Sequence, residues 1–333
     1  MNGNTLQESR SPLSLIDTSF DRYMKMRQAS AQEHMDGGVP DYSFALDEQM
    51  RKRVLQIPGF YSIGKKLLAT RTAREMHMIN QDGIAVGPNQ FGDIYQMGVE
   101  CAQKLGIGVP NIYVINRTDM NAYTIAADDM SPIIVLHSGI VERMTPGELK
   151  CVIAHECGHI HNNHAIPKCI VNILLSLGTA IPGAALLVSA ANIALMNFWT
   201  RAGEITADRA AVICADNLQD ALNVDYKLMY GAVLNNAEEM NIEALREQLK
   251  QIMDSPTRIM EAGQLYTNEK GQIVFAGKDH PGSIRRIFAA MEFAESDLYY
   301  KWRPEMKKPG AVMRSKKEVD DRCQKLINIL NND

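Results

Sequence analysis

The chain has 333 residues, of which 46% are hydrophobic and 22% are charged, and its formal net charge is −4. This composition is typical of a soluble globular protein that is long enough for one large domain or two ordinary domains. Because the balance of charge is slightly acidic, no basic field exists to attract nucleic acid or an anionic membrane, and we expect no nucleic-acid partner.

The N-terminal segment, residues 1–40, has no basic region followed by an apolar run, so we expect no secretory signal and a cytoplasmic location. It mixes Ser, Gln, Asn, Met and charged residues and ends in Gly-Gly-Val-Pro, which predicts a mobile leader; an inhibitory role for it stays open. Residues 41–109 are predicted to form an N-terminal helical layer. Apolar residues recur there at helical spacing over 45–80, with a break near Pro58, and a further helix is predicted over 90–105.

The sequence changes in character at Pro110, where short runs rich in β-branched and aromatic residues predict two or three strands of a small sheet. A helix is predicted from Thr145, because this residue is a suitable N-cap, a proline follows it, and Glu148 three residues later completes a capping box. The stretch AHECGHIHNN, residues 154–163, is therefore expected to lie in a helix that runs toward Pro167.

The segment from Cys169 to Thr200 has no charged residue, a feature that it shares with membrane-spanning helices. A spanning helix needs about 20 continuous apolar residues, whereas a Pro-Gly pair at 182–183 and three asparagines interrupt this run. We predict a buried or surface-covering helical hairpin over 169–199, and peripheral membrane association through it stays open. Residues 216–260 are predicted to be helical and amphipathic, and 301–333 to form a C-terminal helical tail.

The sequence HECGH within the predicted helix is an HExxH motif. On a helix, His155 and His159 lie one turn apart on the same face, so both imidazoles can reach one metal ion, while Glu156 can contact a water held by that ion. The alternative is a solvated histidine-rich helix face. His161 and His164 point away from the direction of His159, so we expect them in solvent or behind the ligands.

A catalytic zinc site usually has three protein ligands and one position for water, so a third ligand must come from another part of the chain. The best candidate is Glu204, which shares one predicted helical face with Asp208 four residues later. Glu204 would complete a His2Glu site for one zinc ion per chain, and Asp208 would accept a hydrogen bond from the ring N–H of a ligating histidine. By itself, an ExxxD pair is usually a solvated helix face, so this assignment depends on the HExxH motif.

These motifs resemble the gluzincin peptidases that include the HtpX-like proteases and the type I CAAX prenyl proteases. The resemblance covers residues 111–287 in order, and besides TPGELKCVIAHECGHIHNNH and TRAGEITADRAA it includes two further signatures. They are a NAF-like strand, Asn121, Ala122 and Tyr123, and an HPxxxxRI pattern with His280 and Arg286. The chain lacks the clear spanning helices of the integral-membrane members, so it resembles a soluble or peripheral branch.

The resemblance implies an α+β, predominantly helical, zincin-like metalloprotease fold with a small mixed sheet over the HExxH helix. The catalytic domain would comprise residues 110–300. The resemblance also implies zinc bound by His155, His159 and Glu204, and a strand at 121–123 that pairs with an extended protein or peptide substrate.

The predicted function is that of a zinc-dependent endopeptidase. Zinc would lower the pKa of its bound water and polarise the scissile carbonyl, while Glu156 accepts the water proton and delivers it to the leaving amine. His280 or Arg286 is a candidate donor to the oxyanion. A loop histidine is an equal alternative for His280, and a structural bridge to a carboxylate such as Asp208 is the favoured alternative for Arg286.

Three other functions stay open. The first is a zinc-stabilised binding or scaffold protein without chemistry, although such a protein would not need Glu156. The second is a latent protease that is held inactive by its leader or by an insertion around 238–278. The third is a membrane-embedded protease.

Overall fold

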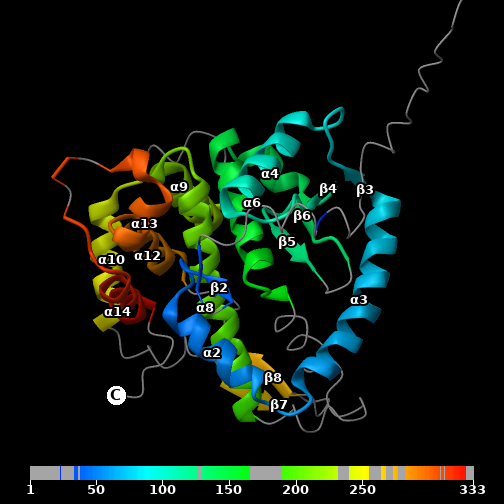
Figure 1. Ribbon diagram of the computed structural model, residues 1–333, viewed down its shortest axis with the longest axis horizontal. Helices are drawn as coiled ribbons and strands as arrows, with labels where there is room; N and C mark the ends of the chain where they lie inside the picture. The colour runs from blue at the N-terminus through cyan, green and yellow to red at the C-terminus, as the bar shows by residue number, and fades with distance from the viewer. Residues whose placement is uncertain are drawn as a thin grey trace, which may run out of the picture.

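The computed structural model describes residues 23, 34–36, 38–126, 130–165, 190–231, 240–254, 264–267, 273–276, 282–307, 309–310 and 312–327. Most of the predicted leader, residues 169–189 of the predicted hairpin, much of the segment 238–278 and His280 lie outside this part of the chain. Within it, most elements are helices, and the strands form three small sheets (Figure 1).

The described chain begins with a pair of short strands and two helices. Strand β1 (Met35–Asp36) pairs with β2 (Val39–Pro40), and helices α2 (Ala45–Leu55) and α3 (Phe60–Asp82) follow. The two helices are separated near Pro58, which confirms the predicted break. Helix α3 runs along one edge of the molecule (Figure 1).

The main sheet has four strands, in the order β3 (Gly83–Ala85), β4 (Asn111–Ile115), β6 (Ile133–His137) and β5 (Ala122–Ile125). The central pair is parallel and both outer pairs are antiparallel, which confirms the predicted small mixed sheet. All residues of β6 are buried, as expected of a central strand, whereas β5 forms one edge of the sheet. Strand β3 belongs to the predicted N-terminal layer, in which the sequence pattern predicts only helices.

Helix α6 (Pro146–His161) carries the HExxH motif and packs against β5. It begins with the predicted capping box: the Glu148 backbone N–H donates to Thr145 Oγ1 at 3.3 Å, and the Thr145 N–H donates to Glu148 Oε2 at 2.8 Å. These bonds satisfy donors that the first turn of a helix leaves without an intrahelical partner. The predicted start of this helix is therefore confirmed.

The end of α6 differs from the prediction of a helix that runs toward Pro167. The helix ends at His161, and Asn163 adopts a φ of +56°, a left-handed conformation that asparagine tolerates better than most residues. The chain then turns back, so that the His164 N–H donates to the carbonyl oxygen of His159 at 3.0 Å. This reversal returns His164 to the HExxH motif.

Helix α8 (Ala190–Cys214) packs closely against α6 and carries the predicted third ligand. Gly158 allows this approach, because a Cβ atom at that position would lie 2.8 Å from the Cβ of Ala210 and 3.0 Å from the Cα of Ala207. A side chain at 158 would force the two helices apart. The short distance lets side chains of α6 and α8 meet around one point.

The remaining elements surround this helix pair (Figure 1). They are α4 (Gly92–Leu105), α5 (Ser138–Arg143), α9 (Leu218–Tyr230), α10 (Ile242–Asp254), β7 (Gln264–Thr267), β8 (Ile273–Ala276), α12 (Ser283–Ala294), α13 (Asp297–Trp302), the 3-10 helix η5 (Pro304–Met306) and α14 (Lys316–Ile327). Helices α9, α10, α12, α13 and α14 gather on the side of the molecule away from α3 (Figure 1). The predicted class, α+β and predominantly helical with a small mixed sheet over the HExxH helix, is confirmed.

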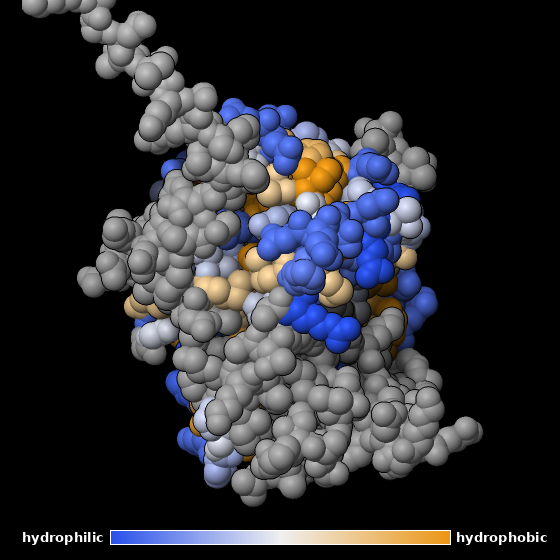
Figure 2. All heavy atoms as spheres, turned by 90° about the vertical axis from the view of Figure 1, so that its right-hand side faces the viewer, coloured by the Kyte–Doolittle hydropathy of each residue, from blue (hydrophilic) through white to orange (hydrophobic). Residues whose placement is uncertain are grey.

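The described surface on the side of α3 is largely hydrophilic, with smaller apolar areas between the polar residues (Figure 2). Among the residues that the structure describes, no helix has both the length and the apolar character that crossing a bilayer requires.

Candidate metal centre

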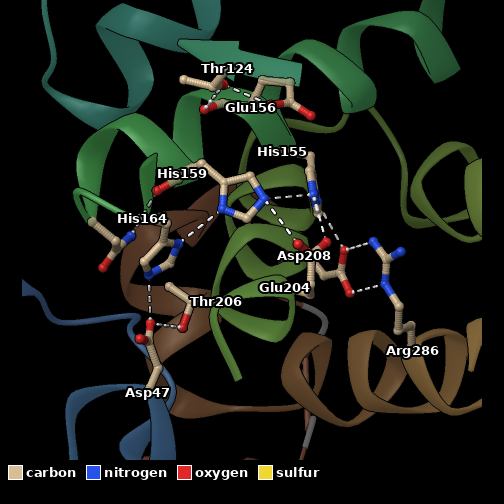
Figure 3. Close-up of polar contacts among 12 residues, drawn as sticks. Asp47, Thr124, His155, Glu156, His159, His164, Glu204, Thr206, Asp208 and Arg286 are labelled. Carbon is tan, nitrogen blue, oxygen red and sulfur yellow. Dashed lines mark hydrogen bonds and ion pairs between the residues drawn. The ribbon is translucent and has the colours of Figure 1, made fainter. Parts of the chain in front are cut away.

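Three side chains from α6 and α8 converge on one point: His155, His159 and Glu204 (Figure 3). The two histidine Nε2 atoms are 3.1 Å apart, and Glu204 places its carboxylate oxygens 3.4 Å from Nε2 of His155 and 3.5 Å from Nε2 of His159. Ligand atoms about 2.0–2.1 Å from a tetrahedral ion lie about 3.4 Å from one another. The spacing of these nitrogen and oxygen atoms therefore fits a single small cation, and two imidazoles with one carboxylate are a donor set that zinc accepts.

The electrostatics of the cluster also favour a cation. The side chain of Glu204 is only 1% exposed, so its charge faces the two imidazoles rather than water. Burial opposes protonation of His155, but the hydrogen bonds and charges of Asp208 and Glu204 outweigh it and raise the pKa of this imidazole to about 10. The metal-free cluster thus retains a proton where a bound cation would place its own charge.

Glu156 lies on α6 next to the first histidine and faces strand β5. Its Oε2 accepts a hydrogen bond of 2.7 Å from the Thr124 hydroxyl, which is also 3.3 Å from the Glu156 backbone oxygen. The glutamate is buried, yet it lines the same cavity as His155 and Glu204. The edge strand thereby fixes a carboxylate beside the three converging side chains.

Asp208 and Arg286 form a buried support behind His155 (Figure 3). Asp208 Oδ1 is 3.0 Å from Nδ1 of His155, and Arg286 Nε donates to Asp208 Oδ2 at 2.8 Å. Burial raises the pKa of Asp208, but the positive charge and hydrogen bonds of Arg286, together with His155, outweigh it and lower the pKa. A charged Asp208 accepts the Nδ1–H of His155, which leaves Nε2 free to face a metal.

A second carboxyl lies beyond this support. Asp225 Oδ1 is 3.2 Å from Nη1 of Arg286, yet burial raises the pKa of Asp225 to about 7. The charge of Arg286 lowers the pKa of Asp225, but by less than burial raises it. Arg286 binds Asp208 with two nitrogens, so most of its charge is already compensated there.

A cavity of about 270 Å³ opens beside the cluster. Much of its wall is apolar and comes from helices α5, α6, α8 and α9, including Ile140, Val152, Val212, Val224 and Leu228. Asn121 and Ala122, at the start of the edge strand, complete one side, whereas Tyr123 turns its ring toward His137, with 6.0 Å between the ring centroids. The structure thus brings together the predicted ligands, Glu156 and part of the predicted substrate strand; His280 lies outside the described residues.

Two further residues support the site. His164 was expected in solvent or behind the ligands, and the second alternative is confirmed, because His164 is buried with Nδ1 2.9 Å from Nδ1 of His159. Sequence reasoning did not assign the other residue. Asp47, on α2, lies 3.0 Å from Nε2 of His164. The available signal for Asp47 is an acidic residue among the apolar positions of α2, a pattern that does not identify its partner.

Comparisons with known proteins agree with this geometry. The chain matches the model of Peptidase family M48 over residues 88–294. It is 32% identical over 216 residues to the plastoglobule-localized metallopeptidase 48, chloroplastic, of Arabidopsis thaliana, a match that covers 65% of this chain and 62% of that protein. No solved structure matches.

Two proteins named Protease HtpX homolog are similar over shorter stretches. The one from Helicobacter pylori is 42% identical over 62 residues, 18% of this chain and 20% of that protein. The one from Thermoanaerobacter pseudethanolicus is 23% identical over 137 residues, 41% of this chain and 43% of that protein. The chain thus spans less than two thirds of each of these relatives. Since the family match covers well over half of the chain and includes the HExxH helix, Glu204 and Arg286, the chain belongs to peptidase family M48.

Proposed function

We propose that this protein is a zinc-dependent endopeptidase that hydrolyses peptide bonds of protein or peptide substrates. The observation that carries the proposal is the convergence of His155, His159 and Glu204 within 4.8 Å of one another, with Glu156 lining the same cavity. A purely structural zinc site needs four closed ligands and no extra carboxylate, whereas three ligands with a neighbouring carboxylate are the arrangement of hydrolytic sites.

Each residue has a defined task in this proposal. His155, His159 and Glu204 would hold one zinc ion, which would supply a polarising charge for the scissile carbonyl and an acidified water. Glu156 would accept the proton of that water and return it to the leaving amine. Because Thr124 occupies Oε2 of Glu156, we assign Oε1 as the oxygen that takes the proton.

The shape of the site supports an extended peptide as substrate. Strand β5 is one edge of the main sheet, and its first residue, Ala122, lines the cavity together with Asn121 just before it. An extended chain can add to such an edge through main-chain hydrogen bonds, which bind it with little dependence on sequence. The apolar wall of the cavity would then accept an apolar side chain next to the cleaved bond.

The test is zinc content, measured by mass spectrometry, together with cleavage of a peptide library by the wild type and by Glu156→Gln. We expect one zinc in both proteins and cleavage by the wild type alone, because the amide of glutamine cannot accept the proton. Zinc in both without any cleavage would favour the scaffold or the latent protease, and cleavage after removal of residues 1–40 would then identify latency. Absence of zinc from both would overturn the metal assignment.

A further inference from the structure

The ring nitrogen of His159 that faces away from the cluster has a partner of its own. Nδ1 of His159 lies 2.9 Å from Nδ1 of His164, and Nε2 of His164 lies 3.0 Å from Oδ2 of Asp47. All three residues are buried. They form a continuous line from the metal cluster to helix α2 (Figure 3), which we call the Asp47–His164–His159 relay.

For a neutral His164, the contacts assign each proton of the relay to one nitrogen. Asp47 is an acceptor, so Nε2 of His164 is the donor in their contact, and Nδ1 of a neutral His164 then carries a lone pair. Nδ1 of His159 must therefore carry the proton in the contact with His164. This arrangement leaves the lone pair of His159 on Nε2, the atom that faces His155 and Glu204.

Other contacts hold the outer end of the relay in place. Asp47 accepts hydrogen bonds from Thr206 Oγ1 at 2.6 Å and from Trp199 Nε1 at 2.7 Å, both on α8. Gly203 makes room for the imidazole of His164, because a Cβ atom at 203 would lie 3.1 Å from ring atoms Cε1 and Nδ1 of His164. Hydrogen bonds from α8 thus hold Asp47, and close packing against Gly203 holds His164. Helix α8 therefore supplies a metal ligand and also anchors the relay.

The two histidines of the cluster are supported differently. His155 contacts the carboxylate of Asp208 directly, whereas His159 reaches the carboxylate of Asp47 through a second imidazole. The second support starts outside the region that the family model matches, since that match begins at residue 88.

We propose that His164 and Asp47 are positioning residues that hold His159 in the tautomer and orientation needed to bind the metal, so that helix α2 is part of the metal centre. This inference rests on the proposed function, because it requires zinc at His155, His159 and Glu204. It follows that the N-terminal layer is required for full metal affinity, in addition to any role in folding.

The test is the zinc affinity of the full chain, measured by competition with a chromophoric chelator, for the wild type, His164→Phe and Asp47→Asn. Phenylalanine keeps a ring of similar shape but has no nitrogen, and asparagine keeps the shape of Asp47 but not its charge. Loss of an outer partner of a metal ligand typically weakens metal binding about 10- to 100-fold. We expect the loss of zinc affinity in His164→Phe to lie in this range. The loss in Asp47→Asn should be near the lower end, because Asp47 acts on His159 through one more hydrogen bond.

Two control variants separate positioning from general damage. Asp320→Asn removes a buried carboxylate that pairs with Arg209, and His137→Phe removes a buried imidazole that pairs with Asp119. Both are expected to lower stability without changing zinc affinity. A second readout is the 15N NMR spectrum of labelled histidine in the metal-free protein. We expect a single Nδ1–H tautomer for His159 in the wild type and a mixture in His164→Phe.

The outcomes distinguish this inference from the proposed function. Zinc bound with equal affinity by the wild type, His164→Phe and Asp47→Asn would overturn the relay and leave the metal site intact. Equal losses in the variants and in the two controls would also overturn it, since the effect would then be one of stability alone. If Asp47→Asn fails to fold, His164→Phe and the tautomer spectrum decide. Absence of zinc from the wild type would overturn the proposed function itself.

Discussion

Thr124, in the edge strand β5, donates a hydrogen bond of 2.7 Å to Oε2 of Glu156, so the sheet that would bind a substrate also orients the proposed base. A hydrogen bond to a charged group contributes about 1.5–3 kcal/mol, and here it also holds the carboxylate of Glu156 in one orientation. The bond therefore connects substrate binding at the strand with proton transfer at the helix.

Thr124→Val is expected to lower kcat about 10-fold while zinc content stays at the wild-type level. Valine has the shape of threonine without the hydroxyl, so Glu156 would lose its anchor but the strand would remain. Thr124→Ser restores the hydroxyl and is expected to recover most of the activity. Steady-state kinetics and metal analysis of the three proteins test this; loss of zinc in Thr124→Val would contradict it.

Local sequence patterns were sufficient for the parts of the site that depend on helix geometry. The capping box of Thr145 and Glu148 marks the start of α6, and the spacing of His155 and His159 follows from 3.6 residues per turn. Glu204 could be selected only because an HExxH site needs a third ligand, which is a chemical argument rather than a local pattern.

The other parts of the site and of the fold depend on contacts between segments that are distant in the sequence. The return of His164 requires the left-handed conformation of Asn163, which the sequence tolerates but does not demand. Asp47 is 117 residues from its histidine, and no local period links the two. Strand β3 is three residues long, too short for an alternation pattern to be recognised.

Arg286→Gln is expected to destabilise the metal-free protein by about 3–5 kcal/mol, because it removes the guanidinium that binds the buried carboxylate of Asp208 through two nitrogens. Urea denaturation followed by circular dichroism measures this change. Lys250→Ala, which removes an exposed ion pair with Glu247, serves as the control and is expected to change stability little. Similar stabilities for the wild type and Arg286→Gln would show that the ion pairs of Arg286 do not stabilise the fold.

Asp225 is expected to make the metal-free protein less stable as pH rises from about 4 toward 7. Burial raises its pKa to about 7, above the value of about 3.9 in an unfolded chain, so the folded state binds one more proton in this window. The stability that Asp225 contributes is fully present below its pKa in the unfolded chain. This contribution is lost as the pH rises through its pKa in the folded protein. Because other carboxyls also titrate, the informative quantity is the difference between the wild type and Asp225→Asn.

The measurement is the free energy of unfolding of both proteins between pH 4.5 and 7.5. Relative to Asp225→Asn, the wild type is expected to lose stability steadily across this range. A constant difference between the two proteins would show that Asp225 titrates at its ordinary pKa and that Arg286 compensates its charge fully.

The register of β5 predicts which of its backbone groups are available to a substrate. The His137 N–H donates to the Asn121 carbonyl at 3.0 Å, and Tyr123 lies opposite Val135 two residues farther along. Since hydrogen-bonded pairs alternate along an antiparallel ladder, Asn121 and Tyr123 bond inward to β6, whereas Ala122 directs its N–H and C=O to the outer edge of the sheet.

Ala122→Pro is therefore expected to lower kcat/KM for peptides about 10-fold, because it removes a donor from the outer edge without removing a bond of the sheet. Zinc affinity and the unfolding midpoint should stay near those of the wild type. Tyr123→Pro is the matched comparison: it removes a ladder bond and is expected to lower the unfolding midpoint as well. Full kcat/KM in Ala122→Pro would show that the substrate does not bind by adding to this strand, even if the zinc site and Glu156 act as proposed.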